Sequence, residues 1–405
     1  MLKLKNKRIN KCLLCGNKNL KKIFSLGNLF ISNFVNKQKI KKGLKAPLAL
    51  KYCKKCTLIQ LSHIAPQELM YKKFYWYKSG INKTMRDELK ELYLSAMKIV
   101  NIKKNDVVLD IGANDGTLLK YFKNQGLLTI GCEPAKNLKN ELKKNCHYMI
   151  NDFWQKNKLD NILKIKNLKK PKIITAIGMF YDLEFPNQFI SDAAQSLHEN
   201  GVFIAQLMCL NSMIKKNDLG NICHEHIEFY SHKSLIYLFE RNGLEIFKIE
   251  ENDVNGGSYR IFCRKKINGS IRLKKENVLK NIYKFKKNIE INKKRTLNFI
   301  KKEHAKGKKI FLYGASTKGN TVLQYYGITN KLIPFAAERS KNKWGKYTIG
   351  TGIKIISEKR ARELDPDYFF VTPWGFIKEF IKREKKWLNK GRKFILPFPF
   401  FKLVK

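Results

Sequence analysis

The sequence predicts an α/β protein in which a doubly wound, mostly parallel sheet lies between a small cysteine-rich module and a second α/β domain. Short apolar strands alternate with helical patterns through the middle of the chain, as such a sheet requires. Two C-x-x-C pairs precede this region, and another strand, glycine turn and helix follow it. Because 405 residues are too many for one core, we expect domains at 1–70, 71–265 and 266–405.

The N-terminal region contains two pairs of cysteines, Cys12 with Cys15 and Cys53 with Cys56. The C-x-x-C spacing lets both thiolates of one turn reach a single tetrahedral ion, and Gly16 relieves the first turn. Two unrelated pairs of free thiols are the alternative. A redox role is disfavoured, because neither pair sits at the strand–helix junction of a βαβ unit. We therefore expect a structural zinc site whose four ligands leave no open position for catalysis.

The central region should supply the strands of the main sheet. Buried strands are predicted at 107–111, 127–132, 172–177, 202–207, 244–249 and 259–263. A helix should begin at Thr117, directly after the first glycine turn. Asn255, Gly256 and Gly257 form a turn between the last two strands, so this hairpin should add an antiparallel edge.

The C-terminal region should begin with a lysine-rich linker helix at 272–305. A strand at 309–313, a glycine turn at 314–320 and a helix at 321–326 follow it, and further strands are expected at 333–337, 368–371 and 393–396. The chain is therefore expected to contain two nucleotide-type α/β units in tandem.

The formal net charge of +49 is extreme, and most of it comes from lysine spread along the whole chain. One reading is a nucleic-acid or membrane partner. The other is biased codon usage that fills solvated faces with lysine. We favour this second reading because arginine, whose guanidinium binds phosphate through two hydrogen bonds, is scarce. A positive field would still attract an anionic substrate. The oligomeric state is left open by the sequence.

Membrane insertion and export are not expected. No apolar run approaches the roughly 18 residues of a membrane span, and no apolar segment of a signal peptide follows the basic N-terminus. A cytoplasmic location follows, and it argues against disulfides among the nine cysteines.

The glycine turn of the central region reads Asp110-Ile-Gly112-Ala-Asn114-Asp115-Gly116. Its glycines let the backbone approach a ligand closely, and Glu133, at the end of the next strand, is placed to accept hydrogen bonds from ribose hydroxyls. The spacing differs from the G-x-G-x-x-G of dinucleotide folds. Asp110 and Asp115 suit a cationic amino-acid ligand, which points to S-adenosylmethionine rather than to a mere tight turn.

Two residues near the end of the third expected strand extend this prediction to the adenine ring. Asp152 could accept a hydrogen bond from the adenine amino group, and Phe153 could pack on the ring. Ordinary core packing is the alternative for Phe153.

Residues 224 to 226 read His-Glu-His, with Glu228 and Tyr230 close behind. A metal site is one interpretation, since His224 and His226 would share one face of a strand, but the H-E-x-x-H spacing of zinc proteases is absent. We favour proton transfer. An imidazole near neutral pKa, oriented by a carboxylate, can take a proton from carbon next to a carbonyl, and the enolate can then attack a methyl donor.

These motifs together resemble the sugar C-methyltransferases of the nucleotide-hexose 3-C-methyltransferase type, over nearly the whole chain. The motifs that carry the resemblance are the four cysteines, the turn at 108–116, Phe180-Tyr-Asp-Leu-Glu184, Cys223-His-Glu-His226, Gly256-Gly-Ser-Tyr-Arg260, Gly314-Ala-Ser-Thr-Lys-Gly-Asn-Thr321 and Gly350-Thr-Gly352. The resemblance implies a zinc-binding module, a class I methyltransferase core, and a C-terminal Rossmann-like domain that helps to hold a sugar nucleotide. It also implies that His226, helped by Glu225, lies in the region of the base.

The sequence departs from that family at two positions. Cys223 stands where the best-studied pattern has tyrosine, with Tyr230 as a replacement to consider, and Asn255 stands at the first position of the usual His-Gly-Gly-Ser motif. Lys318 and Asn320 in the C-terminal turn, Arg339 after the next strand, and Cys223 are the expected substrate contacts.

The function expected from the sequence is S-adenosylmethionine-dependent C-methylation of a keto-deoxysugar nucleotide, in deoxysugar or polysaccharide biosynthesis. A sugar or small-molecule O-methyltransferase, a zinc-bearing RNA methyltransferase and a non-catalytic binding protein are the alternatives. Of these, only the RNA enzyme would require lysines gathered around the cofactor mouth.

Overall fold

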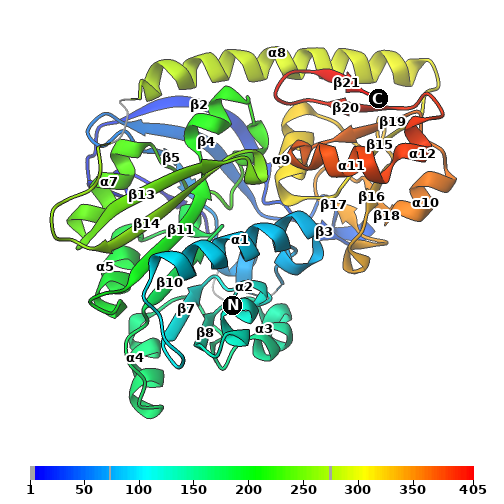
Figure 1. Ribbon diagram of the computed structural model, residues 1–405. Coiled ribbons are helices and arrows are strands. Elements are labelled where there is room, and N and C mark those ends of the chain that lie inside the picture. Colours follow the sequence, from blue (N-terminus) through cyan, green and yellow to red (C-terminus); the bar gives the residue numbers. More distant parts are fainter. Residues whose placement is uncertain (1–4, 73, 273–275) are drawn as a thin grey trace.

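A computed structural model describes residues 5–72, 74–272 and 276–405, and Figure 1 shows their arrangement. Within these ranges, a central sheet of seven strands is flanked by a four-stranded sheet of the N-terminal module and an eight-stranded sheet of the C-terminal domain. Helix α8 (Val278–Ala305) runs along the top of the view, over β2 (Leu20–Phe30) and the last strands of the chain.

The central sheet has the strand order β13-β14-β11-β10-β7-β8-β9. Its strands are β7 (Val107–Ile111), β8 (Leu128–Cys132), β9 (Tyr148–Ile150), β10 (Ile173–Ile177), β11 (Val202–Met208), β13 (Leu244–Asn252) and β14 (Ser258–Lys265). Strand β14 is antiparallel to both of its neighbours, whereas the strands from β11 to β9 are parallel. The predicted doubly wound sheet with an antiparallel hairpin is confirmed.

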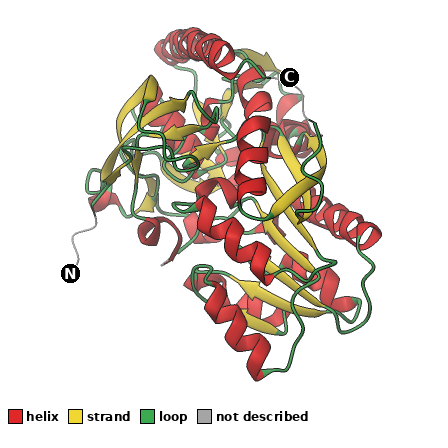
Figure 2. Ribbon diagram, turned by 90° about the vertical axis from the view of Figure 1, so that its left-hand side faces the viewer, coloured by secondary structure: helices red, strands yellow, loops and turns green. Residues whose placement is uncertain are grey.

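Side chains along each central strand alternate between two cores. On β11, Phe203 and Leu207 belong to the core that contains α5 and α7, whereas Ile204 belongs to the core that contains α1 and α2. Figure 2 shows helices on both sides of the strands, which explains why the strands read as continuous apolar runs. The helices are α1 (Lys83–Ile99), α2 (Thr117–Asn124), α3 (Lys139–Asn145), α4 (Lys156–Ile165), α5 (Pro186–Ser196), α6 (Leu210–Lys215) and α7 (His232–Arg241).

The N-terminal module is built into the central domain by a shared sheet of order β12-β5-β4-β2. Strands β4 (Lys45–Cys53) and β5 (Ile59–Leu61) belong to the module, but β12 (Glu228–Phe229) comes from the central region. In the pairing of β12 with β5, Glu228 lies opposite Gln60. Strands β1 (Lys7–Arg8) and β6 (His63–Ile64) form a separate pair. The His-Glu-His segment therefore runs directly into a strand that is held by the cysteine module.

The C-terminal sheet has the order β21-β20-β19-β15-β16-β18-β17-β3. Its last strand, β3 (Phe34–Val35), comes from the N-terminal module, so the first and last regions of the chain are also joined by backbone hydrogen bonds. The other strands are β15 (Ile310–Tyr313), β16 (Phe335–Glu338), β17 (Tyr347–Thr348), β18 (Lys354–Ser357), β19 (Tyr368–Val371), β20 (Lys393–Leu396) and β21 (Lys402–Val404). The remaining helices are α9 (Thr317–Tyr326), α10 (Glu358–Glu363), α11 (Ile377–Arg383) and α12 (Lys385–Leu388).

Two helix boundaries differ from those predicted. The linker helix begins at Val278 rather than at 272, and residues 273–275 lie outside the described part of the chain. Helix α9 begins at Thr317 rather than at 321, because the Ser316 hydroxyl accepts a hydrogen bond from the Gly319 N–H (2.9 Å) and caps the helix there. Lys318 and Asn320 are therefore in a helix rather than in a loop.

Across the described ranges, none of the helices is both long enough and apolar enough to cross a bilayer.

Candidate active site

A cavity of about 890 Å³ opens at the carboxyl ends of the central strands, between the three regions of the chain. It is lined by the turn after β7, by Glu133, Glu225 and His226, and by Lys318 of α9. The carboxyl edge of a parallel sheet is where ligands of this fold bind. The structure thus brings the predicted cofactor turn and the predicted base into one space.

The turn after β7 has the shape of a cradle for an adenosyl group. Gly112 has φ +77°, and a Cβ there would lie 2.7 Å from Cγ of Met179. The Glu133 carboxylate is buried and fixed, since it accepts hydrogen bonds from the backbone N–H groups of Asn114 (2.9 Å) and Ala135 (2.9 Å). Each oxygen keeps a lone pair for a ribose hydroxyl, so these residues fit the predicted cofactor.

Asp110 is buried beneath this turn, where its carboxyl accepts a hydrogen bond from Thr175 Oγ1 (2.6 Å). Burial, together with repulsion from Glu133, raises the pKa of Asp110 to about 7. The group is therefore about half-protonated at neutral pH, and a cationic ligand nearby would favour its charged form.

Of the other residues predicted to bind the cofactor, one lines the cavity and two support the turn after β7. Asn114 lines the cavity and binds the Ser79 N–H (3.0 Å) through Oδ1. The Asp115 carboxylate accepts hydrogen bonds from the Gly80 N–H (2.8 Å) and from Thr117 Oγ1 (2.7 Å). Gly116, at φ +76°, is the N-cap of α2. Asp115 and Gly116 thus shape the turn from behind rather than line the cavity.

The structure separates the two residues that were predicted to bind adenine. Phe153 lines the cavity. Asp152 pairs instead with Lys158 (2.5 Å) and Lys72 (3.5 Å), and the Lys158 hydrogen bond lowers the pKa of Asp152. Asp152 does not line the cavity, so the geometry favours Phe153 alone as an adenine contact.

His226 is held with one ring nitrogen fixed. Nδ1 lies 2.7 Å from the Asn221 carbonyl oxygen. A carbonyl accepts but cannot donate, so Nδ1 carries the hydrogen and Nε2 is the nitrogen that can take a proton. Burial and the Lys318 ammonium lower the pKa of His226 well below its usual range. The ring, packed edge-on to Tyr181 at 4.5 Å, is therefore a neutral base at pH 7.

A backbone carbonyl, rather than the predicted carboxylate, orients this imidazole. The Glu225 carboxylate accepts a hydrogen bond from Thr317 Oγ1 (3.0 Å), and the Glu225 carbonyl accepts one from the Tyr71 hydroxyl (3.2 Å). Burial raises the pKa of Glu225. Glu225 thus connects the central domain to α9 and to the segment that follows the cysteine module.

Three more of the predicted site residues, in addition to Asp115, Gly116 and Asp152, lie outside the cavity lining. His224 donates from Nε2 to the Ala46 carbonyl (3.0 Å), on a strand of the cysteine module. Tyr230 is fully buried and packs against Phe180 at 5.3 Å. Asn320 is buried and donates to the Ile349 carbonyl (3.3 Å). These side chains hold the structure together, and Tyr230 is not positioned to replace the family tyrosine.

The two predicted cationic contacts have different surroundings. Lys318 lines the cavity and donates to Asn221 Oδ1 (2.9 Å). Asn221 therefore positions His226 with its carbonyl and Lys318 with its side chain. Arg339 binds Glu379 (3.2 Å) and Asn82 outside the cavity lining.

Cys223 lies behind the cavity, close to Glu225 and His226. Potential metal-binding atoms of Cys223, Glu225 and His226 all lie within 4.8 Å of one another. The Lys318 ammonium lies near the same groups, where it lowers the pKa of each of them. That positive charge disfavours a second cation, in agreement with the proton-transfer interpretation.

The charges in the cavity are divided by region. Seven carboxylates, all from the central region, line it; we call them the acidic wall (Asp110, Glu133, Asp182, Glu184, Asp192, Asp218 and Glu225). Four lysines, from the N-terminal and C-terminal regions, also line it; we call them the lysine wall (Lys39, Lys42, Lys318 and Lys343). Among the described lining residues there is no arginine. In a chain of net charge +49, carboxylates thus outnumber lysines in the cavity.

Asp182 was part of a quoted motif but was given no role from the sequence. It follows β10, lines the cavity, and has one buried oxygen without a hydrogen-bond partner among the described residues. Burial and the nearby Glu225 raise the pKa of Asp182 well above its usual range. Its place at the carboxyl end of a central strand was the signal that could have identified it. No comparable signal marks Asn221, because its key contact is made by a backbone carbonyl.

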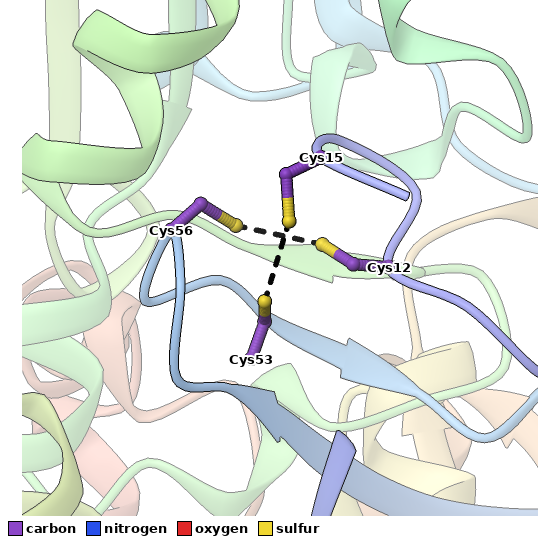
Figure 3. Close-up of side chains that lie close together, drawn as sticks. All are labelled: Cys12, Cys15, Cys53 and Cys56. Atoms are coloured by element: carbon purple, nitrogen blue, oxygen red, sulfur yellow. Dashed lines mark hydrogen bonds between the residues drawn. The ribbon is translucent and has the colours of Figure 1, made fainter. Parts of the chain in front are cut away.

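The four cysteines of the N-terminal module converge as predicted (Figure 3). Sγ of Cys12 lies 3.4 Å from Sγ of Cys56, and Sγ of Cys15 lies 3.5 Å from Sγ of Cys53. Thiolates bound tetrahedrally at ~2.3 Å from zinc lie about 3.8 Å apart, whereas disulfide sulfurs lie ~2.05 Å apart. The set therefore fits one zinc ion with no open position.

Comparison with known proteins supports this arrangement. Three family models match in sequence: "Putative zinc binding domain" at 12–71, "Methyltransferase domain" at 78–249 and "C-methyltransferase C-terminal domain" at 253–399. The C-methyltransferase NovU of Streptomyces niveus is 24% identical over 405 residues, which covers 96% of each chain.

Two solved structures were also compared with the chain. A methyltransferase in complex with the Trm112 activator from Haloferax volcanii is 12% identical and covers 46% of this chain and 95% of its own, with a TM-score of 0.37. Magnesium protoporphyrin IX methyltransferase from Synechocystis is 12% identical and covers 46% and 89%, with a TM-score of 0.36. TM-scores of 0.37 and 0.36 are too low to support a conclusion about this chain.

The fold and the family models define an S-adenosylmethionine-dependent methyltransferase whose zinc-binding module contains the four clustered cysteines. More particularly, the models of a zinc-binding domain, a methyltransferase domain and a C-methyltransferase C-terminal domain match this chain in tandem, and the chain is similar to a C-methyltransferase over nearly its whole length.

Proposed function

We propose that the protein methylates a carbon of a keto-deoxysugar nucleotide. A proton leaves the carbon next to the ketone, the C–H electrons form an enolate, and the enolate carbon forms the new C–CH₃ bond. S-adenosylmethionine, when bound, would supply the electrophilic methyl group: its S–CH₃ bond would break with the electron pair left on sulfur, and S-adenosylhomocysteine would be the leaving group. The observation that carries the proposal is the neutral His226 imidazole, with Nδ1 fixed on Asn221, in the same cavity as Gly112 and Glu133.

His226 is the proposed base, and its Nε2 takes the proton. The Lys318 ammonium lowers the pKa of His226 in the free protein. Negative charge that develops on the substrate beside Lys318 would offset this effect, so the imidazole becomes a stronger base when the proton is transferred. Lys318, held by Asn221, is in this view the electrostatic partner of His226.

Asp182 is the proposed donor to the ketone oxygen. Burial and the nearby Glu225 raise the pKa of Asp182, which favours the protonated carboxyl, and its unpartnered oxygen is buried beside the cavity. A carboxyl that is kept neutral by burial can donate a hydrogen bond to a developing enolate. His226 and Asp182 then divide the chemistry between a base and an acid.

The acidic wall supports a small cationic cofactor and disfavours RNA as substrate. A groove for a nucleic-acid backbone requires clustered cations, whereas carboxylates outnumber lysines around this cavity. The charge distribution therefore favours the sugar substrate over the RNA alternative.

The test combines transfer and exchange. The protein is incubated with S-adenosylmethionine labelled in the methyl group and a panel of 4-keto-6-deoxy sugar nucleotides, and label is expected in a carbon-bound methyl group. In deuterium oxide with S-adenosylhomocysteine, the hydrogen next to the ketone should exchange, and His226→Gln should abolish exchange and transfer. Transfer to oxygen without exchange would support O-methylation. Label in RNA and in no sugar would refute the proposal.

A further inference from the structure

We propose that the nucleotide half of the substrate binds at the end of the cavity formed by the N-terminal module, with its diphosphate at Lys39 and Lys42 and its base against Trp76 and Phe34. This inference rests on the proposed function, because it takes the substrate to be a sugar nucleotide. It assigns a substrate subsite to the zinc-bearing module and to the segment that follows it.

Charge is the first argument. The acidic wall and the two N-terminal lysines, Lys39 and Lys42, come from different regions of the chain, whereas Lys318 lies near carboxylates of the acidic wall. A cation and an anion that share the cavity are therefore attracted to different residues. The turn after β7 and Glu133 lie on the acidic wall, where the cationic cofactor fits. A diphosphate therefore belongs on the lysine wall.

The lysines of that wall differ in their availability. Lys318 donates to Asn221, and Lys343 donates to the Ala315 carbonyl (2.7 Å) and pairs with Glu338 (3.3 Å). Within the described parts of the chain, Lys39 and Lys42 make no side-chain hydrogen bond or ion pair. These two ammonium groups are thus the ones free to bind phosphate oxygens.

The loop that carries Lys39 and Lys42 is held in place. Lys42 N–H donates to the Lys39 carbonyl (3.0 Å), and the Gly350 N–H donates to the Ile40 carbonyl (2.7 Å). A Cβ at Gly43 would lie 2.3 Å from Ile349 Cδ1, so the loop is packed closely on the C-terminal domain. The two lysines are therefore presented from a docked turn rather than from a free one.

Aromatic side chains that line the same cavity supply the second argument. Trp76 is fixed by a hydrogen bond from Nε1 to Asn33 Oδ1 (2.9 Å), and it lies edge to face with Phe34, with ring centroids 5.1 Å apart. Both rings line the cavity. Lys343 Nζ lies 4.9 Å from the centre of the Phe34 ring, and Lys346 Nζ lies 5.9 Å from the centre of the Trp76 ring. Fixed aromatic rings near ammonium groups form a platform on which a base can stack.

The position of the sugar follows from these two ends. With the diphosphate at Lys39 and Lys42 and the methyl donor at the turn after β7, the sugar ring falls between them. His226 and Lys318 line the same cavity. The reacting carbon is thus placed beside the proposed base.

Equilibrium binding tests the subsite without turnover. Uridine, thymidine and guanosine diphosphate are titrated by calorimetry into the full-length protein saturated with S-adenosylhomocysteine, together with uridine and inorganic pyrophosphate. The variant K39A/K42A should bind each diphosphate at least about tenfold more weakly, because charge-assisted hydrogen bonds are lost, and should bind uridine unchanged. Trp76→Leu should weaken uridine and the diphosphates but leave pyrophosphate unchanged.

Lys41→Ala is the matched control, because Lys41 is exposed in the same loop and does not line the cavity. Equal losses in Lys41→Ala and K39A/K42A would overturn the subsite, since the effect would then come from the overall field. Unchanged diphosphate binding in K39A/K42A would also overturn it, while the proposed methyl transfer could still stand. If the wild type binds none of the nucleotides, the sugar-nucleotide class of substrate fails as well.

Discussion

Glu133 and Glu338 occupy equivalent positions in two strand–turn–helix units of the same chain. Glu133 accepts hydrogen bonds from Asn114 N–H and Ala135 N–H, and Glu338 accepts them from Ala315 N–H (3.0 Å) and Ser340 N–H (2.9 Å). Each carboxylate thus binds the turn after the preceding strand and the amide two residues beyond itself.

The two carboxylates differ in what else they contact. Glu338 also pairs with the buried ammonium of Lys343, which in addition binds the Ala315 carbonyl. Within the described residues, Glu133 has no lysine partner of this kind. The first unit therefore keeps its carboxylate for a ligand, whereas the second has its own cation there.

Glu133→Gln should weaken binding of S-adenosylmethionine by about 10- to 100-fold, because a charged acceptor for the ribose hydroxyls is lost. Glu338→Gln is the matched control and should leave cofactor affinity unchanged. It should lower the stability of the fold, because the buried Lys343 ammonium would lose its carboxylate partner. Calorimetric titration with S-adenosylhomocysteine and thermal unfolding measure the two effects. Equal loss of affinity in both variants would contradict the assignment of the cofactor to the first unit.

His226→Gln should lower kcat for methyl transfer by about 10²- to 10⁴-fold, the usual contribution of a general base. Since the pKa of His226 is lowered, the imidazole stays neutral as the pH falls to 6.5, and the acidic limb of the rate profile should lie below that pH. His224→Gln should mainly lower stability, because His224 contacts Ala46 behind the cavity. A rate that falls with a midpoint above pH 7 would contradict His226 as the base.

Asp110→Asn should flatten the dependence of stability on pH. The pKa of Asp110 is about 7 in the folded protein and ~3.9 when unfolded. Between these values the folded state binds more protons, so the stability from this group is present at low pH and is lost as the pH rises through 7. In urea unfolding, the free energy of unfolding should fall less between pH 5 and pH 8 for Asp110→Asn than for wild type. Identical decreases in the two proteins would argue against a protonated Asp110.

The sequence was sufficient for features that depend on neighbouring residues. The turn at Gly112, the carboxylate at Glu133 and the two C-x-x-C turns each combine a local conformation with a nearby functional group, and a strand pattern places them. The structure confirms the strands of the central sheet. They could be predicted because both of their faces are buried, which gives continuous apolar runs in the sequence.

Long-range pairing could not be predicted in the same way. Strands β3 and β12 have two residues each, which is too short for a periodic signal, and their partners lie far away in sequence. The same limit applies to Asn221, whose carbonyl orients His226, and to Glu225, which bonds Thr317 of another domain. Contacts of these kinds decide which members of the His-Glu-His segment face the cavity.

Cys53→Ser should remove zinc and lower methyl transfer, although Cys53 does not line the cavity. The reason is the shared sheet: Leu61 N–H donates to the Ile227 carbonyl (2.9 Å), directly after His226, and β5 pairs with β12. Loss of the ion should destabilise the protein by several kcal/mol and loosen this anchor. Cys146→Ser, at a buried cysteine outside the cluster, is the control and should retain zinc. Metal analysis should find one zinc per chain in wild type. If Cys53→Ser does not fold, chelation of the wild type followed by added zinc should abolish and restore activity, and full activity in the zinc-free protein would refute the link between the module and the base.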